Sequence, residues 1–116
     1  EFNLEINEMT SVVIVTRGHE YDLLCLRNSI CSQACYIGMI GSRTKVNTNF
    51  SILLEEGISK KALERVAAPI GLDLGGQKPE EIALSIIAQM VALENGRTGT
   101  SLVRSIDDLL CQQAKL

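Results

Sequence analysis

Four residues that could do chemistry follow a short apolar run at 12–15: Arg17, Gly18, His19 and Asp22. His19 is the single histidine of the chain and our candidate catalytic residue, because beside a glycine it could act as an acid, a base or a ligand near neutral pH. Asp22 could orient it or bind a ribose hydroxyl, and Arg17 could hold a carboxylate or phosphate with its planar guanidinium. The competing interpretation is structural: His19 begins a helix, Asp22 complements its dipole and Arg17 is a solvated surface residue.

A second group follows the next apolar run and contains Gly38, Gly41, Ser42, Arg43 and Lys45. The glycines would let the backbone approach a ligand closely. The start of a helix, a hydroxyl and two cations would supply donors and positive charge, which together outline an anion-binding site. The alternative is that Ser42 caps a helix while both cations are only solvated.

Two smaller features complete the candidates. Asp73 lies between glycines and could line a cleft, although a turn is the favoured interpretation. The four cysteines have no C-x-x-C spacing, so we expect reduced thiols that are mainly buried, with Cys35 the least certain; they are Cys25, Cys31, Cys35 and Cys111.

The elements that position these residues alternate between strands and helices. Apolar runs and periodicities, capping residues and glycine stops predict them. In chain order they are a half-exposed edge strand at 2–7, a central strand at 12–15, a helix from about 20 to 30, a strand at 36–40, a helix from about 43 to 56, a short helix at 60–66, an extended segment at 68–72, a helix at 79–95 and a short terminal helix after Ser105.

This alternation predicts an α/β fold with a short parallel sheet flanked by helices. Parallel strands end at the same edge, so both polar loops should meet there, where ligands bind in such sheets. Nearly every position from Ile82 to Leu93 is aliphatic or alanine, which favours a central packing helix.

Composition limits the classes of function. The 116 residues predict a single domain, and 3% aromatic residues imply an aliphatic core without a stacking platform for single-stranded nucleic acid. A net charge of −3 with no basic run makes nucleic acid a poor partner. With no apolar stretch of roughly 20 residues and no signal-peptide pattern, we expect no membrane association and a cytoplasmic location.

At these loops the chain resembles the C-terminal Rossmann-like domain of the xanthine dehydrogenase accessory protein family, the XdhC/CoxI type. The resemblance rests on four segments and their order: V-V-I-V-T-R-G-H-E-Y-D at 12–22, Y-I-G-M-I-G-S-R-T-K at 36–45, P-I-G-L-D-L-G at 69–75 and P-E-E-I-A-L-S-I at 79–86. It implies a maturation factor that binds molybdenum cofactor (molybdopterin), protects it and passes it in sulfurated form to a xanthine dehydrogenase-like molybdenum hydroxylase.

The chain departs from the family pattern in lacking the first Gly-rich βαβ unit, since no G-x-G-x-x-G occurs. We interpret residues 1–116 as one Rossmann-like domain, either the C-terminal part of a longer accessory protein or a short form. An uncovered sheet edge would favour a homodimer. Two alternative functions stay open: half of an NAD(P)-dependent oxidoreductase, and a non-catalytic docking module. The residues show no complete catalytic constellation, so a cofactor chaperone is favoured over an enzyme.

Overall fold

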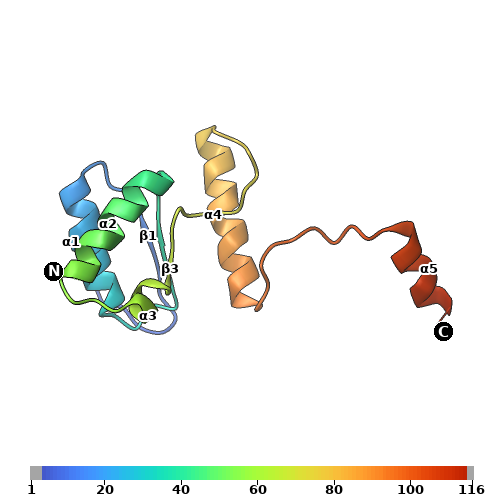
Figure 1. Ribbon diagram of the computed structural model, residues 1–116, viewed down its shortest axis with the longest axis horizontal. Coiled ribbons are helices and arrows are strands. Elements are labelled where there is room, and N and C mark those ends of the chain that lie inside the picture. The colour runs from blue at the N-terminus through green and yellow to red at the C-terminus, as the bar shows by residue number, and fades with distance from the viewer. Residues whose placement is uncertain (1–3, 115–116) are drawn as a thin grey trace.

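The computed structural model describes residues 4–114 of the chain, which contain three strands and five helices. Figure 1 shows how these elements are arranged. In chain order the elements are β1 (Ser11–Ile14), α1 (His19–Ile30), β2 (Tyr36–Met39), α2 (Arg43–Glu55), α3 (Lys60–Leu63), β3 (Val66–Ala67), α4 (Pro79–Glu94) and α5 (Ile106–Ala114). The alternating strands and helices confirm the predicted α/β class. Within the described residues no helix is both long and apolar enough to cross a membrane.

The sheet is parallel throughout, with strand order β1-β2-β3. Val13 of β1 pairs with Gly38 of β2, which pairs in turn with Ala67 of β3. All four residues of β2 are buried, whereas only Ile14 of β1 is. The prediction that 12–15 forms the central strand is therefore wrong: both runs are apolar, and the central place goes to β2, whose two faces are both covered.

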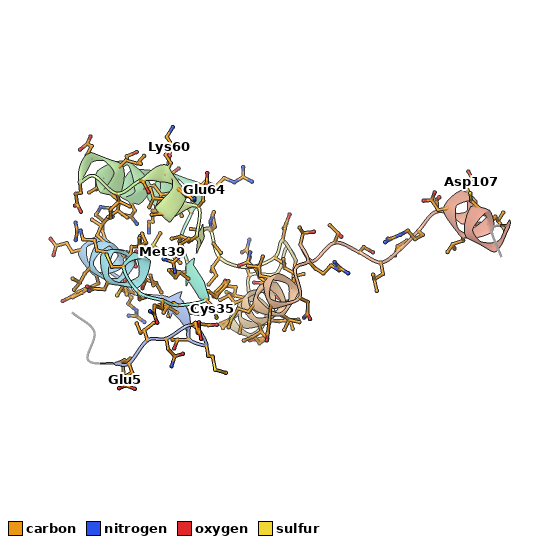
Figure 2. The ribbon with its side chains drawn as sticks, turned by 90° about the horizontal axis from the view of Figure 1, so that it is seen from below. Glu5, Cys35, Met39, Lys60, Glu64 and Asp107 are labelled. Atoms are coloured by element: carbon orange, nitrogen blue, oxygen red, sulfur yellow. The ribbon has the colours of Figure 1, made fainter. Side chains whose placement is uncertain are left out.

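The hydrophobic core lies between the sheet and the helices α1 and α2, which cover the same face (Figure 1). Its most buried side chains come from both helices and from the central strand. They are Leu26 of α1, Leu53 of α2, and Ile37 and Met39 of β2, each at most 1% exposed. Figure 2 shows Met39 between the sheet and these helices. Burial of each such side chain stabilises the fold by about 1.5–3 kcal/mol. The core therefore fixes the ends of β1 and β2 and the starts of α1 and α2, between which the two polar loops run.

The opposite face of the sheet is covered by Ile70 and α4 (Figure 1). The Gln89 side chain joins α4 to this face: its Oε1 accepts hydrogen bonds from the Tyr36 hydroxyl at 2.8 Å and the Gly71 N–H at 3.0 Å. Its Nε2 donates to the Gly71 carbonyl at 3.3 Å. A phenol is already protonated at neutral pH, and burial raises the pKa of Tyr36 further above its ordinary value.

The expectation that the 79–95 helix is the central packing helix is wrong. Within α4 only Ser85 and Ile86 are buried, whereas Leu84, Ile87 and Val91 are 61%, 56% and 52% exposed. A sheet of three short strands is too narrow to cover a helix that is apolar on most sides. The helix bounds were predicted to within one residue, because Pro79 starts the helix and Gly96 follows its C-cap, Asn95.

Three smaller expectations also fail. Residues 4–7 form no strand, because the Asn7 side chain accepts from the Met9 N–H and opens a turn instead, and residues 1–3 lie outside the described part. The short helix predicted at 60–66 ends at Leu63, after which β3 begins at Val66. Burial of the cysteines is likewise wrong for three of four: Cys25 is partly buried, whereas Cys31, Cys35 and Cys111 are exposed, and all four are free.

The C-terminal part forms an arm. Residues 97–105 run out from α4 to α5, far from the sheet, as Asp107 shows in Figure 2. Ser105 caps α5 by accepting from the Asp108 N–H at 3.1 Å, as the capping pattern predicted. The molecule measures 57 × 30 × 27 Å, and the arm accounts for the length of its longest dimension.

Candidate functional site

The two polar loops meet at one cavity, at the edge of the sheet where β1 and β2 end. Its volume is about 310 Å³. The segment after β1 and the start of α1 form one wall, and the segment after β2 with the first turns of α2 forms the other. The lining residues are Thr16, Arg17, His19, Asp22, Ile40, Gly41, Lys45 and Asn49. Five predicted site residues, Arg17, His19, Asp22, Gly41 and Lys45, are thus brought together.

The wall after β1 is organised by Thr16. Its hydroxyl lies within hydrogen-bonding distance of the Gly18 carbonyl, at 3.1 Å, and of the Asp22 carboxylate. Gly18 is the N-cap of α1 in an extended conformation and has no side chain to cap the helix. Thr16 therefore orients Asp22, and no bond from Asp22 to His19 is formed. This leaves His19 as an exposed group at the cavity rather than as part of a catalytic dyad.

The wall after β2 is the start of α2. Gly41 adopts a φ of 151°, and Ser42 caps the helix by accepting from the Lys45 N–H at 3.2 Å. The capping interpretation of Ser42 is therefore correct, and its hydroxyl does not line the cavity. Arg43 is exposed and also lies outside the lining. Of the two cations predicted here, Lys45 alone contributes to the cavity, opposite Arg17.

Three lining residues, Thr16, Ile40 and Asn49, were not predicted as site residues, and Asn49 alone of these lies outside the two polar loops. Its side chain is 1% exposed, and its Oδ1 has no hydrogen-bond partner among the described residues. Its Nδ2 reaches only the Met39 sulfur, at 3.9 Å. The signal that could have revealed Asn49 is an amide in the apolar stripe of α2, between Val46 and Leu53.

Gly38 and Asp73 are placed differently from the first group. We expected Gly38 to let a ligand approach the backbone closely. Gly38 is instead buried in β2, and the side chain that packs closely against it is that of Ile70. Asp73 lies in a neighbouring cavity of about 350 Å³, which shares Ile40 and Gly41 with the first. A turn forms around Asp73, where the Leu74 N–H donates to the Leu72 carbonyl at 2.9 Å, so the turn interpretation and the cleft interpretation both hold.

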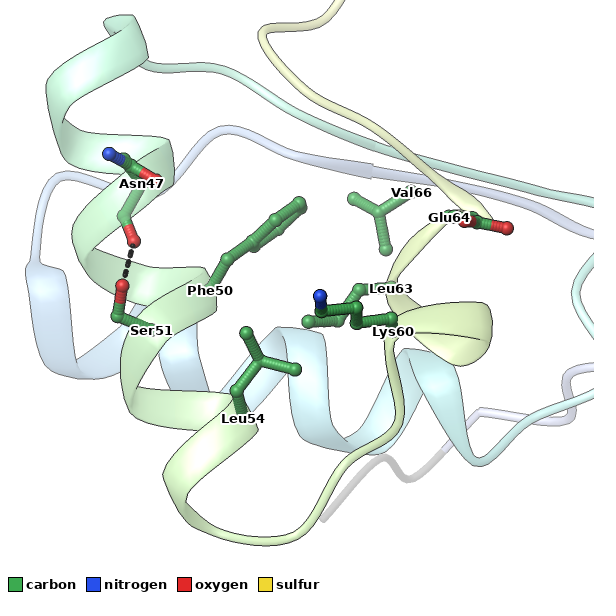
Figure 3. A pocket seen from close by; sticks show the side chains of 8 residues that line it. All are labelled: Asn47, Phe50, Ser51, Leu54, Lys60, Leu63, Glu64 and Val66. Atoms are coloured by element: carbon green, nitrogen blue, oxygen red, sulfur yellow. Dashed lines mark hydrogen bonds between the residues drawn. The ribbon is translucent and has the colours of Figure 1, made fainter.

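A third cavity, of about 390 Å³, lies between α2 and α3 (Figure 3). Its walls are mainly apolar side chains, and Lys60 and Glu64 lie at its side. The one hydrogen bond drawn there is a local one, from Ser51 to the Asn47 carbonyl at 2.9 Å. No cluster of three potential metal ligands occurs among residues 4–114. The cavity between the two loops is the best candidate site, because it gathers Arg17, His19, Asp22 and Lys45.

The geometry is that of a Rossmann-type α/β domain with a cationic cavity at the carboxyl edge of its parallel strands. Comparison with known sequences then gives the family. A profile of the XdhC Rossmann domain matches residues 2–90, and the chain belongs to this family.

Two curated proteins and one crystal structure are similar to the chain. It is 29% identical over 96 residues to the uncharacterised protein YqeB of Escherichia coli, covering 83% of the chain and 17% of that protein. It is 26% identical over 81 residues to a probable xanthine dehydrogenase subunit of Bacillus subtilis, covering 70% and 22%. The structure, of a xanthine dehydrogenase from Bacillus halodurans, superposes with a TM-score of 0.67 at 27% identity.

The superposition covers 90% of this chain and 28% of the Bacillus halodurans chain. The chain thus spans less than a third of the length of each of these relatives. The similarity extends across all three strands of the sheet and the helices around them, so it includes the elements that form the cavity.

Proposed function

We propose that this chain is the Rossmann domain of an accessory factor for molybdenum hydroxylases of the xanthine dehydrogenase type. Its role is to bind the molybdenum cofactor at the cavity between the two loops and to assist sulfuration or insertion of that cofactor. The observation that carries the proposal is the gathering of Arg17, His19, Asp22 and Lys45 around one cavity. Membership of the XdhC Rossmann domain family supports the accessory role.

The residues around the cavity fit a phosphate-bearing pterin. Arg17 and Lys45 would hold the phosphate, because both are cations and Arg offers a planar set of donors. Asp22 and the buried Asn49 would accept hydrogen bonds from the ring system, which is rich in N–H groups. The cofactor itself supplies the molybdenum chemistry, and this chain's residues bind and orient it. The chain then acts as a chaperone rather than as a stand-alone enzyme.

The main competing ligand is a dinucleotide such as NAD(P). Pyrophosphate binding in Rossmann folds depends on a Gly-rich turn, and this sequence has no G-x-G-x-x-G. The other alternative is a docking module that contacts the hydroxylase without binding cofactor. The convergence of two cations and two acceptors at one cavity favours a ligand over simple docking.

The test is a titration of the protein with isolated molybdenum cofactor, with NAD and NADP titrated in parallel. We expect the cofactor to bind and to raise the melting temperature, because a ligand that binds only the folded state stabilises it. The dinucleotides should have little effect. A rise in melting temperature with NAD or NADP alone would instead support the oxidoreductase alternative.

A pull-down with a xanthine dehydrogenase-type hydroxylase separates the chaperone from the docking module. Charge reversal at Arg17 and Lys45 should abolish cofactor binding and leave any contact made by another face intact. If the wild-type protein never binds cofactor and the double variant still captures the hydroxylase, docking is the better account.

A further inference from the structure

Asn49 occupies a position that the packing of α2 assigns to an apolar residue. Val46 and Leu53, one turn before and one turn after it on the same face, are 6% and 0% exposed and belong to the core. At 1% exposed, Asn49 is as deeply buried as they are. A leucine there would bury more apolar surface and leave no polar group behind, so packing alone does not explain the amide.

The amide also lacks the partners that a buried polar group needs. Its Oδ1 accepts no hydrogen bond among the described residues, and its Nδ2 reaches only the sulfur of Met39, a weak acceptor. A buried carbonyl oxygen without a donor destabilises the folded state. A donor that arrives with a ligand would remove this cost, because Asn49 lines the cavity.

The cavity has two chemically different ends. Lys45 is exposed and lies one turn before Asn49 on the same helix face, which separates the two positions by about 6 Å along the axis. Arg17 and His19 are also exposed, and Asp22 is partly buried. The positively charged groups of Arg17 and Lys45 therefore lie at the solvent end of the cavity, and the unpartnered Asn49 Oδ1 lies at the end toward the core.

We propose that Asn49 is a ligand-binding residue whose Oδ1 accepts a hydrogen bond from an N–H or O–H group at the inner end of the ligand. The ligand class is an organic phosphate with a donor-bearing ring, such as a nucleotide or a phosphorylated pterin. This inference deepens the proposed function and rests on the same cavity. Inorganic phosphate would occupy the outer end alone and would not contact Asn49.

The experiment compares three variants with the wild-type protein. Asn49→Leu removes the amide and keeps the branched shape of the side chain, and Asn49→Ala removes it without risk of overpacking. Ser29→Ala is the matched control, because Ser29 is 0% exposed with an unpartnered hydroxyl but does not line this cavity. The probes are inorganic phosphate, adenosine 5′-monophosphate, adenosine and pterin, with dissociation constants measured by NMR. Melting temperatures are measured without any probe.

We expect Asn49→Leu to raise the melting temperature of the free protein by about 4 °C, because it removes the orphan amide. Both Asn49 variants should bind adenosine 5′-monophosphate or pterin on the order of tenfold more weakly, with phosphate affinity unchanged. Ser29→Ala should leave every affinity unchanged. Which of the two ring systems binds the wild-type protein more tightly decides between a nucleotide and a pterin.

Two results would overturn the inference. One is unchanged ring-probe affinity in both Asn49 variants, and the other is no response of the Asn49 side-chain amide resonance to any ring probe. Failure of the proposed function looks different: inorganic phosphate and adenosine 5′-monophosphate would not bind, while uncharged adenosine or pterin would still bind and would still lose affinity in Asn49→Leu.

Discussion

Gly38 lies in β2 at a position where Ile70 and Tyr36 leave no room for a side chain. A Cβ at this position would lie 2.5 Å from Ile70 Cδ1 and 2.6 Å from the Tyr36 hydroxyl, closer than real contacts allow. Gly38→Ala should therefore destabilise the protein by about 1–3 kcal/mol through overpacking. Chemical denaturation would measure this loss.

The control for this prediction is Gly18→Ala, where the new Cβ would meet only the exposed Tyr21 ring, at 2.9 Å, which can move away. We expect a much smaller loss of stability there. Equal losses in both variants would show that the packing of Ile70 against Gly38 is not what makes this position sensitive.

At the residue scale the sequence predicts one kind of site residue well and another poorly. Arg17 and Lys45 were predicted because parallel strands end at one edge, which is a property of chain order alone. Asn49 was missed because its burial depends on how α2 packs, and a polar residue in a helix is usually solvated. Gly38 was misinterpreted because Ile70, 32 positions later in the sequence, fills the space beside it.

At the element scale, α1 and the end of α2 are joined by an ion pair. The guanidinium of Arg27 donates to the Glu56 carboxylate at 2.5 and 2.7 Å, and this hydrogen bonding lowers the pKa of Glu56. A carboxylate with a depressed pKa stabilises the folded state above its unfolded pKa of about 4.3, and this stabilisation is lost as the pH falls through the folded pKa.

We therefore expect Glu56→Gln to be slightly less stable than the wild-type protein at pH 7, because exposed pairs contribute little, and equal to it below about pH 3. Thermal melts across this range measure the difference. Glu55→Gln, which removes a neighbouring exposed carboxylate, is the control. A gap that persists unchanged at low pH would contradict the assigned ion pair.

The elements themselves were largely predictable, but their places in the fold were not. Ser42, Ser59 and Ser105 each cap a helix, and such local hydrogen bonds can be inferred from sequence. Which strand becomes central and how much of α4 is covered depend on the number of strands in the sheet. The hydrophobic pattern of a sequence predicts which face of a helix or strand is apolar, but it does not predict which other element covers that face.

The whole molecule exposes more surface than a compact monomer would. Its accessible surface is 8,856 Å², whereas a compact protein of 12.7 kDa has about 6,200 Å². The apolar side chains of Leu84, Ile87 and Val91 on α4 contribute to this excess. Standard protein interfaces bury about 1,200–2,000 Å² in total, which is roughly 600–1,000 Å² from each partner, so each chain has more than enough excess surface for a homodimer interface.

We predict that the chain is dimeric at micromolar concentration and that Ile87→Asp shifts it toward monomer. Sedimentation equilibrium measures this change directly. Leu24→Asp is the matched control, because Leu24 is 45% exposed but lies on α1, away from this helix. A wild-type chain that stays monomeric at the highest soluble concentration would contradict the prediction.

The most direct test of the central claim is the affinity for isolated molybdenum cofactor in Lys45→Glu and in Lys61→Glu. The two variants change net charge equally, but Lys45 lines the cavity and Lys61 lies on α3, outside it. We predict at least a tenfold loss of affinity for Lys45→Glu and less than a twofold change for Lys61→Glu. Equal effects of the two substitutions, or no binding by the wild-type protein, would contradict the assignment of this cavity as the cofactor site.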